Sequence, residues 1–333
     1  MLNPKLKLNP KLFNADAEQI PIRRGFGRGL LKAGEQNQKV VALCADLAES
    51  TFMNMFAEKF PERFVEMGVA EQNMAAVSSG MAAMGKIPYC SSYAMFSPGR
   101  NWEQIRTTIA YNDRKVVIAG SHAGVSVGPD GGTHQALEDI ALVRAMPNMD
   151  VLSPCDALEA EKATMALAHT KKPAYLRLAR EKTPVITTPE TPFAIGKAEI
   201  FWLPDIGLAQ VGIVATGALV YRALWASKEL ERKGIKTKVL NLATIKPLHS
   251  EAILSLAKET KAMVTVEEHQ IMGGVGSAVA EMLSQEYPVP IEFIGVRDRF
   301  GQSGAPDELI EHYGMGVSHI MAAVEKVLKR KNT

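Results

Sequence analysis

Residues with proton-transfer chemistry are gathered in one glycine-rich segment, SHAGVSVGPDGGTHQALED (121–139), which follows an apolar run. His122, Asp130 and His134 can donate or accept protons, and Asp130 adds a negative charge. Their spacing fits no zinc template, so an ordinary loop and a binding or catalytic site both stay open. The glycines in and beside the segment would let its backbone pass close to a ligand. They are Gly120, Gly124, Gly128, Gly131 and Gly132.

A second candidate is Glu71, which opens the otherwise uncharged segment EQNMAAVSSGMAAMG (71–85). A carboxylate at a helix start commonly serves only as a favourable partner of the helix dipole. The small apolar residues that follow predict a helix buried on several sides, so Glu71 could instead be a desolvated carboxylate with a chemical role.

These candidates must be positioned by alternating strands and helices. Apolar runs rich in β-branched residues predict strands at 39–46, 115–120, 149–154, 174–179, 211–217, 237–243, 262–268 and 291–296. Helical patterns lie between them at 71–84, 101–111, 156–169, 218–233, 250–260 and 273–286. The alternation predicts an α/β protein of two doubly wound, mostly parallel-sheet domains. Ligands of such sheets gather beyond the carboxyl ends of strands, where segment 121–139 is expected to lie.

Three segments follow from this pattern. The Pro- and Thr-rich stretch TPVITTPETPFAIGK (183–197) predicts a linker, which gives domains at 21–192 and 193–333. Residues 1–20 contain LNPKL twice and are expected to form an arm that packs on a neighbouring chain or is mobile. GGVGS (273–277) follows a strand and is expected to pack a tight strand-to-helix turn rather than to bind phosphate.

Composition excludes several classes of protein. The 38 basic and 36 acidic residues give a net charge of +2, so no nucleic-acid partner and no anionic membrane surface is expected. No window approaches the roughly 18 apolar residues of a membrane span. Cys44, Cys90 and Cys155 are scattered, without the spacing of a metal site or a disulfide framework, which predicts a cytoplasmic location.

Ordered motifs across nearly the whole chain carry a resemblance. GVAEQNM, SSYAMFSPGRNWEQIR, HAGVSVGPDGGTHQALEDIALVRAMPNMDVLSPCD and YLRLAREKTP resemble the pyrimidine-binding domain of the transketolase family. GIVATG, TIKPL, EEH, GGVGSAVAE and FGQSG resemble its C-terminal domain. The family's GDG segment, which holds the metal and diphosphate, does not occur. The resemblance therefore implies the C-terminal subunit of a split enzyme. A second, N-terminal subunit would carry Mg²⁺ or Ca²⁺, in a dimer of two-chain units, a heterotetramer.

The resemblance also implies a cofactor site for thiamine diphosphate. Glu71 matches the glutamate that hydrogen-bonds a nitrogen of the aminopyrimidine ring and activates the cofactor. Tyr93 and Phe96 match aromatic residues that pack on the ring, although ordinary core packing would also explain them. Asp46 and Leu47 match residues at the cofactor edge. The chain departs from the family at Tyr93, which replaces Phe, and at Gly99, which replaces a third aromatic residue.

The same resemblance implies a substrate channel. His122, Asp130 and His134 match residues that contact the sugar, and His134 could bond or transfer a proton near the carbonyl. The residues matching a phosphate-binding cluster are Arg23, Ser50, His122 and Arg180. Guanidinium groups suit phosphate because they bind it bidentately. Arg24 and Arg177 lie close in the sequence and stay alternatives. Pro129 and Gly132 depart from the family pattern.

The predicted function is transfer of a two-carbon ketol unit from a ketose phosphate to an aldose phosphate, as in the pentose phosphate pathway. Three alternatives stay open. One is a deoxyxylulose phosphate synthase, which generally has Arg in place of His122. Another is a 2-oxo-acid dehydrogenase beta chain, which lacks the DGGTHQ pattern. The third is a non-catalytic regulatory or scaffolding homologue, which would not need Glu71 and the polar residues of the loop.

Overall fold

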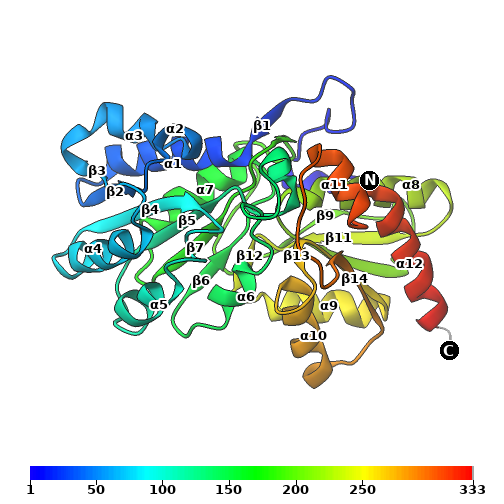
Figure 1. The fold of residues 1–333 in the computed structure, drawn as a ribbon. Coiled ribbons are helices and arrows are strands. Elements are labelled where there is room, and N and C mark those ends of the chain that lie inside the picture. The colour runs from blue at the N-terminus through cyan, green and yellow to red at the C-terminus, as the bar shows by residue number, and fades with distance from the viewer. Residues whose placement is uncertain (332–333) are drawn as a thin grey trace.

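The protein is built on two large β-sheets flanked by helices, as Figure 1 shows for residues 1–331, which this computed structural model describes. The strands are β1 (Gln19–Pro21), β2 (Val40–Cys44), β3 (Phe64–Glu66), β4 (Ile87–Tyr93), β5 (Val117–Ser121), β6 (Asp150–Leu152), β7 (Ala174–Arg177), β8 (Lys182–Pro184), β9 (Glu199–Trp202), β10 (Val211–Ala215), β11 (Thr237–Asn241), β12 (Thr244–Lys246), β13 (Met263–Gln270) and β14 (Ile291–Val296). The α-helices are α1 (Ile22–Gln36), α2 (Ala48–Thr51), α3 (Asn54–Lys59), α4 (Glu71–Ala83), α5 (Trp102–Gln104), α6 (Asp139–Arg144), α7 (Ala157–Leu167), α8 (Val220–Arg232), α9 (Ser250–Thr260), α10 (Val275–Glu286), α11 (Pro306–His312) and α12 (Val317–Lys331).

Both sheets are mostly parallel, which confirms the predicted fold class. The seven-stranded sheet has the order β12-β6-β7-β5-β4-β2-β3, and the five-stranded sheet has the order β14-β13-β10-β11-β9. Only β12 and β9 run antiparallel to their neighbours in these two sheets of the described chain. β12 comes from the second half of the sequence but pairs with β6 of the first sheet. The two halves are therefore joined by main-chain pairing, and a division near residue 192 stays a prediction.

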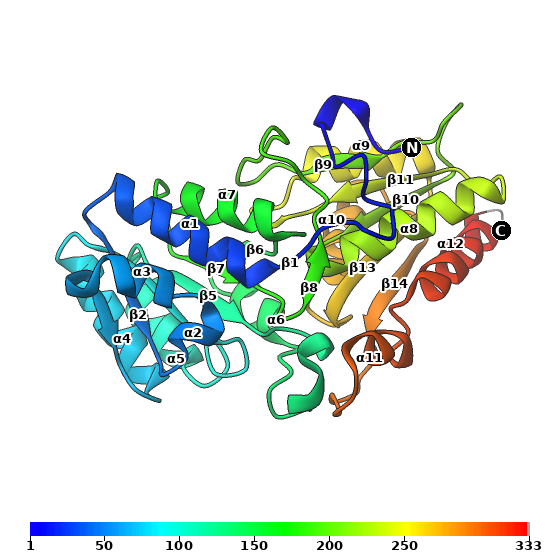
Figure 2. The ribbon, with the colours of Figure 1, turned by 90° about the horizontal axis from the view of Figure 1, so that it is seen from above.

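Helix α1 was not among the predicted helices, because it contains four glycines. Its packing explains them: α1 lies against α7, as Figure 2 shows, and the pair is in close contact. A Cβ atom on Gly25 would lie 1.9 Å from the carbonyl oxygen of Ala157, and one on Gly29 would lie 2.7 Å from that of Glu161. The glycines therefore allow two backbones to approach, at a cost in helix propensity.

Strand β4 was also missed, since IPYCSSY contains a proline and two serines. Both serine hydroxyls are buried and satisfied, because Ser91 donates to the carbonyl oxygen of Ala119 and Ser92 donates to the Glu71 carboxylate. Polar residues can occupy a central buried strand when each finds a partner. β4 matters for the site because it ends at Tyr93.

The N-terminal arm packs within its own chain, so the prediction of a mobile arm or one packed on a neighbour is wrong. Leu6, Leu8 and Leu12 are buried in the core of the second half. Each NPKL repeat forms the same turn, in which the side-chain oxygen of Asn3 or Asn9 accepts a hydrogen bond from the backbone N–H two residues on. Figure 2 shows the arm, in dark blue, beside β9.

Two other predictions have structural outcomes. In GGVGS, the Glu267 carboxylate accepts hydrogen bonds from the N–H groups of Val275 and Gly276, at 2.7 and 2.8 Å. The protein's own carboxylate thus occupies the start of α10, which confirms packing of the turn. Within the described part of the chain, no helix combines the length and apolar character needed to cross a membrane.

Candidate active site

The predicted site residues converge because they follow neighbouring parallel strands. β7, β5, β4 and β2 lie side by side in this order, so their carboxyl ends share one edge of the sheet. Every predicted site residue except Arg23 and Glu71 lies at one of these ends: Asp46, Leu47 and Ser50 after β2, Tyr93 and Phe96 at β4, His122, Asp130 and His134 after β5, and Arg180 after β7. Arg23 and Glu71 lie in the first turns of α1 and α4.

Arg23, Ser50 and Arg180 form one cluster. The Nε of Arg23 donates to the carbonyl oxygen of Arg180 at 3.0 Å, and its Nη1 donates to the carbonyl oxygen of Ser50. Arg180 donates through Nη1 to the carbonyl oxygen of Val127, in the glycine-rich segment. Burial and the neighbouring Arg180 lower the pKa of Arg23. Two guanidinium groups are thereby fixed at one place, which is the arrangement that a tetrahedral anion requires.

The two alternative arginines, Arg177 and Arg24, do not take part in this cluster. Arg177 is buried, and its Nε donates to Oδ2 of Asp139 at 2.8 Å, while Tyr175 donates to the same oxygen. This network supports the sheet and leaves Arg177 unavailable to a ligand. Arg24 is exposed, and it is Arg23 that contacts the other cluster residues.

His122 is held against Tyr93 beside the arginines. Its ring stacks on that of Tyr93, with centroids 3.8 Å apart and an interplanar angle of 25°, and its Nδ1 lies 2.9 Å from the Ser121 hydroxyl. Burial, followed by the charges of Arg23 and Arg180, lowers the pKa of His122 to about 3. His122 is therefore neutral at physiological pH and would contact a ligand by hydrogen bonding rather than by charge.

His134 joins the same group of rings. Its ring meets those of Phe96 and Tyr93 edge-on, at centroid distances of 5.4 and 6.2 Å. Its Nδ1 lies 3.0 Å from the Thr133 hydroxyl, which leaves Nε2 for other contacts. Asp130 ends the 3-10 segment η4 (Val125–Asp130) and is exposed, without a hydrogen bond or ion pair from its side chain in the described chain.

Glu71 lies at the other end of this ring cluster and is only 1% exposed. Its Oε1 accepts from the Ser92 hydroxyl at 3.2 Å, and its Oε2 accepts from Nη1 of Arg100 at 2.8 Å. The Arg100 guanidinium also lies over the Phe96 ring, 4.7 Å from its centroid. Arg100 was not among the predicted site residues, although it is the single charged residue in SSYAMFSPGR between Tyr93 and Asn101.

The residues around Glu71 fit the ring of an aminopyrimidine. Such a ring needs a carboxylate and an aromatic face. The planar guanidinium of Arg100 contacts both, because it donates to Glu71 and lies over the ring of Phe96. A cavity of about 400 Å³ lies beside them, lined by Ala94, Met95, Phe96, Gly99, Arg100, Ala136, Glu138, Asp139 and Leu142. At Gly99 a Cβ atom would lie 1.9 Å from the carbonyl oxygen of Met95, so this backbone admits no third aromatic residue.

Asp46 and Leu47 lie at the edge of the sheet, apart from Glu71. Asp46 has a positive φ of 59°, and its N–H donates to the Glu66 carboxylate at 2.7 Å. Its own carboxylate is exposed. Leu47 packs partly against the core, so the structure gives it a packing role as well.

The glycines of segment 121–139 face the second half of the protein. A Cβ atom on Gly124 would lie 2.2 Å from the Glu268 carboxylate, and one on Gly132 would lie 2.7 Å from the carbonyl oxygen of Gly301. Their small size therefore allows the two halves to pack, and the close approach of this backbone to a ligand stays a prediction.

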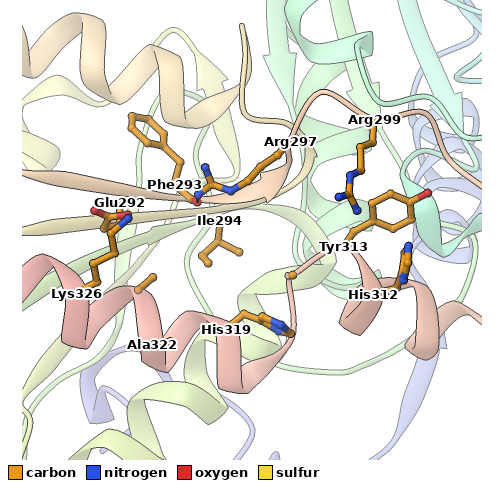
Figure 3. A pocket seen from close by; sticks show the side chains of 12 residues that line it. Glu292, Phe293, Ile294, Arg297, Arg299, His312, Tyr313, His319, Ala322 and Lys326 are labelled. Carbon is orange, nitrogen blue, oxygen red and sulfur yellow. Dashed lines mark hydrogen bonds and ion pairs between the residues drawn. The ribbon is translucent and has the colours of Figure 1, made fainter.

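A separate cavity of about 420 Å³ lies between β14, α11 and α12 (Figure 3). It is lined by basic side chains, including Arg297, Arg299 and Lys326, with Phe293 and Tyr313. The Nη2 of Arg297 donates to the carbonyl oxygen of Phe293. None of the predicted site residues lines this cavity, so it is distinct from the candidate active site.

Comparisons with known proteins agree with this geometry. Residues 18–185 match the transketolase pyrimidine binding domain, and residues 208–320 match the transketolase C-terminal domain. The chain is 38% identical over 320 residues to a 6-deoxy-6-sulfo-D-fructose transketolase subunit of Clostridium sp. strain MSTE9, covering 96% of this chain and 98% of the relative. It is 36% identical over 312 residues to an apulose-4-phosphate transketolase subunit of Phocaeicola vulgatus, covering 93% and 98%. A solved split-gene transketolase, described as an inactive β4 tetramer, superposes with a TM-score of 0.86 at 42% identity, covering 94% and 99%.

Proposed function

The chain belongs to the transketolase family, and on that basis we propose that it is one subunit of a split transketolase that transfers a two-carbon ketol unit from a ketose phosphate to an aldose phosphate. The observation that carries the proposal is the convergence of the buried Glu71, the ring cluster and the paired arginines at one sheet edge. When bound, thiamine diphosphate supplies the carbanion chemistry that ketol transfer needs.

Glu71 is the residue that holds the aminopyrimidine ring. Its carboxyl group would hydrogen-bond a ring nitrogen and favour the imino tautomer, in which that nitrogen carries the hydrogen, and Phe96 would provide the face on which the ring packs. Tyr93 stacks on His122 instead and interacts electrostatically with Arg23, which supports a role for it beside the proposed substrate channel. His122, which is neutral, and His134 contact the sugar through ring nitrogens, and His134 can hold or move a proton near its carbonyl.

Arg23 and Arg180, with Ser50 and His122, bind the terminal phosphate of the substrate. The two relatives differ in the anion that their names specify, a sulfonate in one and a phosphate in the other. Both groups are tetrahedral oxyanions, so an arginine pair of this geometry suits either one. We propose phosphate for this chain, with Asp130 contacting hydroxyl groups of the sugar.

A second polypeptide completes the cofactor site. The two relatives are named as subunits, and the solved relative comes from a split gene and is described as inactive as a β4 tetramer. We propose that an N-terminal transketolase subunit binds the diphosphate and Mg²⁺ or Ca²⁺, in a dimer of two-chain units. The cytoplasmic location and a place in the pentose phosphate pathway stay predictions.

Co-expression with an N-terminal transketolase subunit from the same genome tests this function. The purified complex is expected to transfer ketol units between ketose and aldose phosphates. Glu71→Ala should assemble normally and lose about a hundred- to ten-thousand-fold in turnover, the range typical of lost acid–base assistance. A complex that binds thiamine diphosphate but transfers no ketol unit from any phosphorylated or sulfonated ketose would contradict the proposal.

A further inference from the structure

The five-stranded sheet has its own position for a ligand. β10 connects through α8 to β11 on one side, while β13 lies on the other side of β10. The chain therefore reverses its direction across the sheet between β10 and β13, and such switch points form a crevice beyond the carboxyl ends of the two strands. Thr216 and Gly217 follow β10 there and lead into α8 through the 3-10 segment η5 (Gly217–Leu219).

A cavity of about 430 Å³ occupies this crevice, a size typical of small-molecule sites. Both halves of the protein form its walls: Ser126, Ala179 and Lys182 come from the first half. Ala218 and Glu268 come from the second. None of the residues assigned above to the cofactor, the sugar or the phosphate lines the cavity.

The inner wall carries two buried polar groups, of which one lacks a hydrogen-bonding partner. Glu268 is 4% exposed, and its Oε1 accepts the N–H of Ser126 at 2.6 Å. Ser126 is 8% exposed, and its hydroxyl, although near the Glu268 carboxylate, makes no hydrogen bond of normal geometry in residues 1–331. Since buried polar groups are normally satisfied, the Ser126 hydroxyl indicates a missing hydrogen-bonding partner.

The rim of the cavity has charges of both signs. Arg222 is paired with Asp307 at 2.6 Å and with Glu311 at 3.3 Å, and Lys182 and Glu181 lie on the opposite side. An anion would meet the carboxylates, and a cation would meet Lys182 and Arg222. Hydroxyl groups have no such conflict, because they can donate to Glu268 and also accept from Ser126 or Lys182.

We propose that this crevice is a second binding site, distinct from the candidate active site, and that it takes a small uncharged polyol such as a free sugar, a sugar alcohol or a nucleoside. The ligand donates to Glu268 and bonds the Ser126 hydroxyl. Through these residues it contacts segment 121–139, because Glu268 also packs against Gly124. Occupation of the crevice is thereby coupled to the segment that carries His122 and His134.

Titration calorimetry and saturation-transfer NMR on the full chain, with its partner subunit where that is obtained, test the proposal. The probes are ribitol, glucose and adenosine, compared with ribose 5-phosphate and spermidine. At least one uncharged probe should bind, whereas any binding of ribose 5-phosphate, which the arginine pair of the candidate active site can hold, should be unchanged in Ala218→Phe. Ala218→Phe, which fills the crevice from its rim, should weaken binding of the uncharged probe at least tenfold. Ser126→Ala, which adds no volume, should weaken it at least threefold.

His134→Ala is the matched control, because it alters the proposed sugar channel and leaves the crevice intact. Binding of the uncharged probe should persist in this variant. Absence of binding by all three uncharged probes, binding of a charged probe that Ala218→Phe weakens, or loss of binding in His134→Ala without loss in Ala218→Phe and Ser126→Ala would overturn the proposal. None of these outcomes depends on ketol transfer, so the result is independent of the proposed function.

Discussion

At the scale of single residues, the proposed channel is positively charged because carboxylates do little to neutralise Arg23 and Arg180. Both make their short hydrogen bonds to main-chain carbonyl oxygens. The one carboxylate near them in the described chain is Glu181, 3.6 Å from Arg180 and partly exposed. Most of their positive charge is therefore unneutralised, and it adds to the effect of burial in lowering the pKa of His122. A dianionic phosphate would supply the missing negative charge.

Replacing Arg180 separates a binding role from a structural one. A charge-assisted hydrogen bond contributes about 1.5–3 kcal/mol, so Arg180→Ala should reduce kcat/KM for a ketose phosphate by about ten- to a hundred-fold. The loss should disappear for the unphosphorylated ketose. Steady-state kinetics of both sugars with wild type and variant give the answer, and Arg24→Ala, at an exposed position one residue from Arg23, is the control. Equal losses on both sugars would mean that Arg180 supports the fold.

At the scale of elements, most of the strands that carry the site were predictable from the sequence, whereas helix α1 and the packing of the arm were not. Periodicity located β2, β5 and β7, and hence the edge where the site lies. It missed α1, whose glycines are explained only by close packing on α7, and it missed β4, whose serines are explained only by their buried partners. Arg100 was missed because a single arginine gives no sign of which carboxylate it will meet.

The arm is part of the core, and one leucine tests this. Leu12 is fully buried, so Leu12→Ala should lower the free energy of unfolding by about 2–5 kcal/mol. Chemical denaturation measures the change, with Lys11→Ala as the control at an exposed neighbouring position. If both variants unfold like wild type, the arm contributes nothing to the core in solution.

The contact between α7 and β11 is sensitive to pH. Glu159 is buried, and it accepts hydrogen bonds from the N–H of Cys155 and the Nδ2 of Asn241, both at 2.7 Å. Burial and the neighbouring Asp156 raise the pKa of Glu159 from 4.5 to about 7. The Oδ1 of Asn241 has no partner in the described chain, and a protonated Glu159 could donate to it once the Asn241 amide flips.

The sign of the resulting pH dependence follows from linkage. Between about pH 4.5 and 7 the folded chain keeps a proton on Glu159 that the unfolded chain has released. This group's contribution to stability is thus complete below pH 4.5 and is lost as the pH rises to about 7, by on the order of 3 kcal/mol. Glu159→Gln should flatten the curve of unfolding free energy against pH and be more stable than wild type at pH 8. Burial also raises the pKa of Glu267, and this contribution is the same in wild type and in Glu159→Gln. The effect of Glu159 is therefore measured as the difference between the two stability curves. Parallel curves would refute this assignment.

At the scale of the whole molecule, two parallel sheets are joined into one body whose site opens along one sheet edge. β12 crosses from the second half into the first sheet, and the glycines of segment 121–139 pack against the second half. The second half thus packs against the glycine-rich segment. Glu71, Phe96 and Arg100 would face the proposed partner subunit, which would bind the diphosphate. On this proposal the chain would hold the ring end of the cofactor, and another chain would hold the metal end.

The most direct test of this division is titration calorimetry of thiamine diphosphate with Mg²⁺ on this chain alone, on the N-terminal subunit alone and on their equimolar mixture. The mixture is expected to bind the cofactor at about 1 μM or tighter, and each isolated chain at least a hundred-fold more weakly. A mixture containing Glu71→Ala, which removes the ring's hydrogen-bond acceptor, should bind more weakly than the wild-type mixture. Binding at about 1 μM by this chain without any partner would contradict the division of the site between two chains.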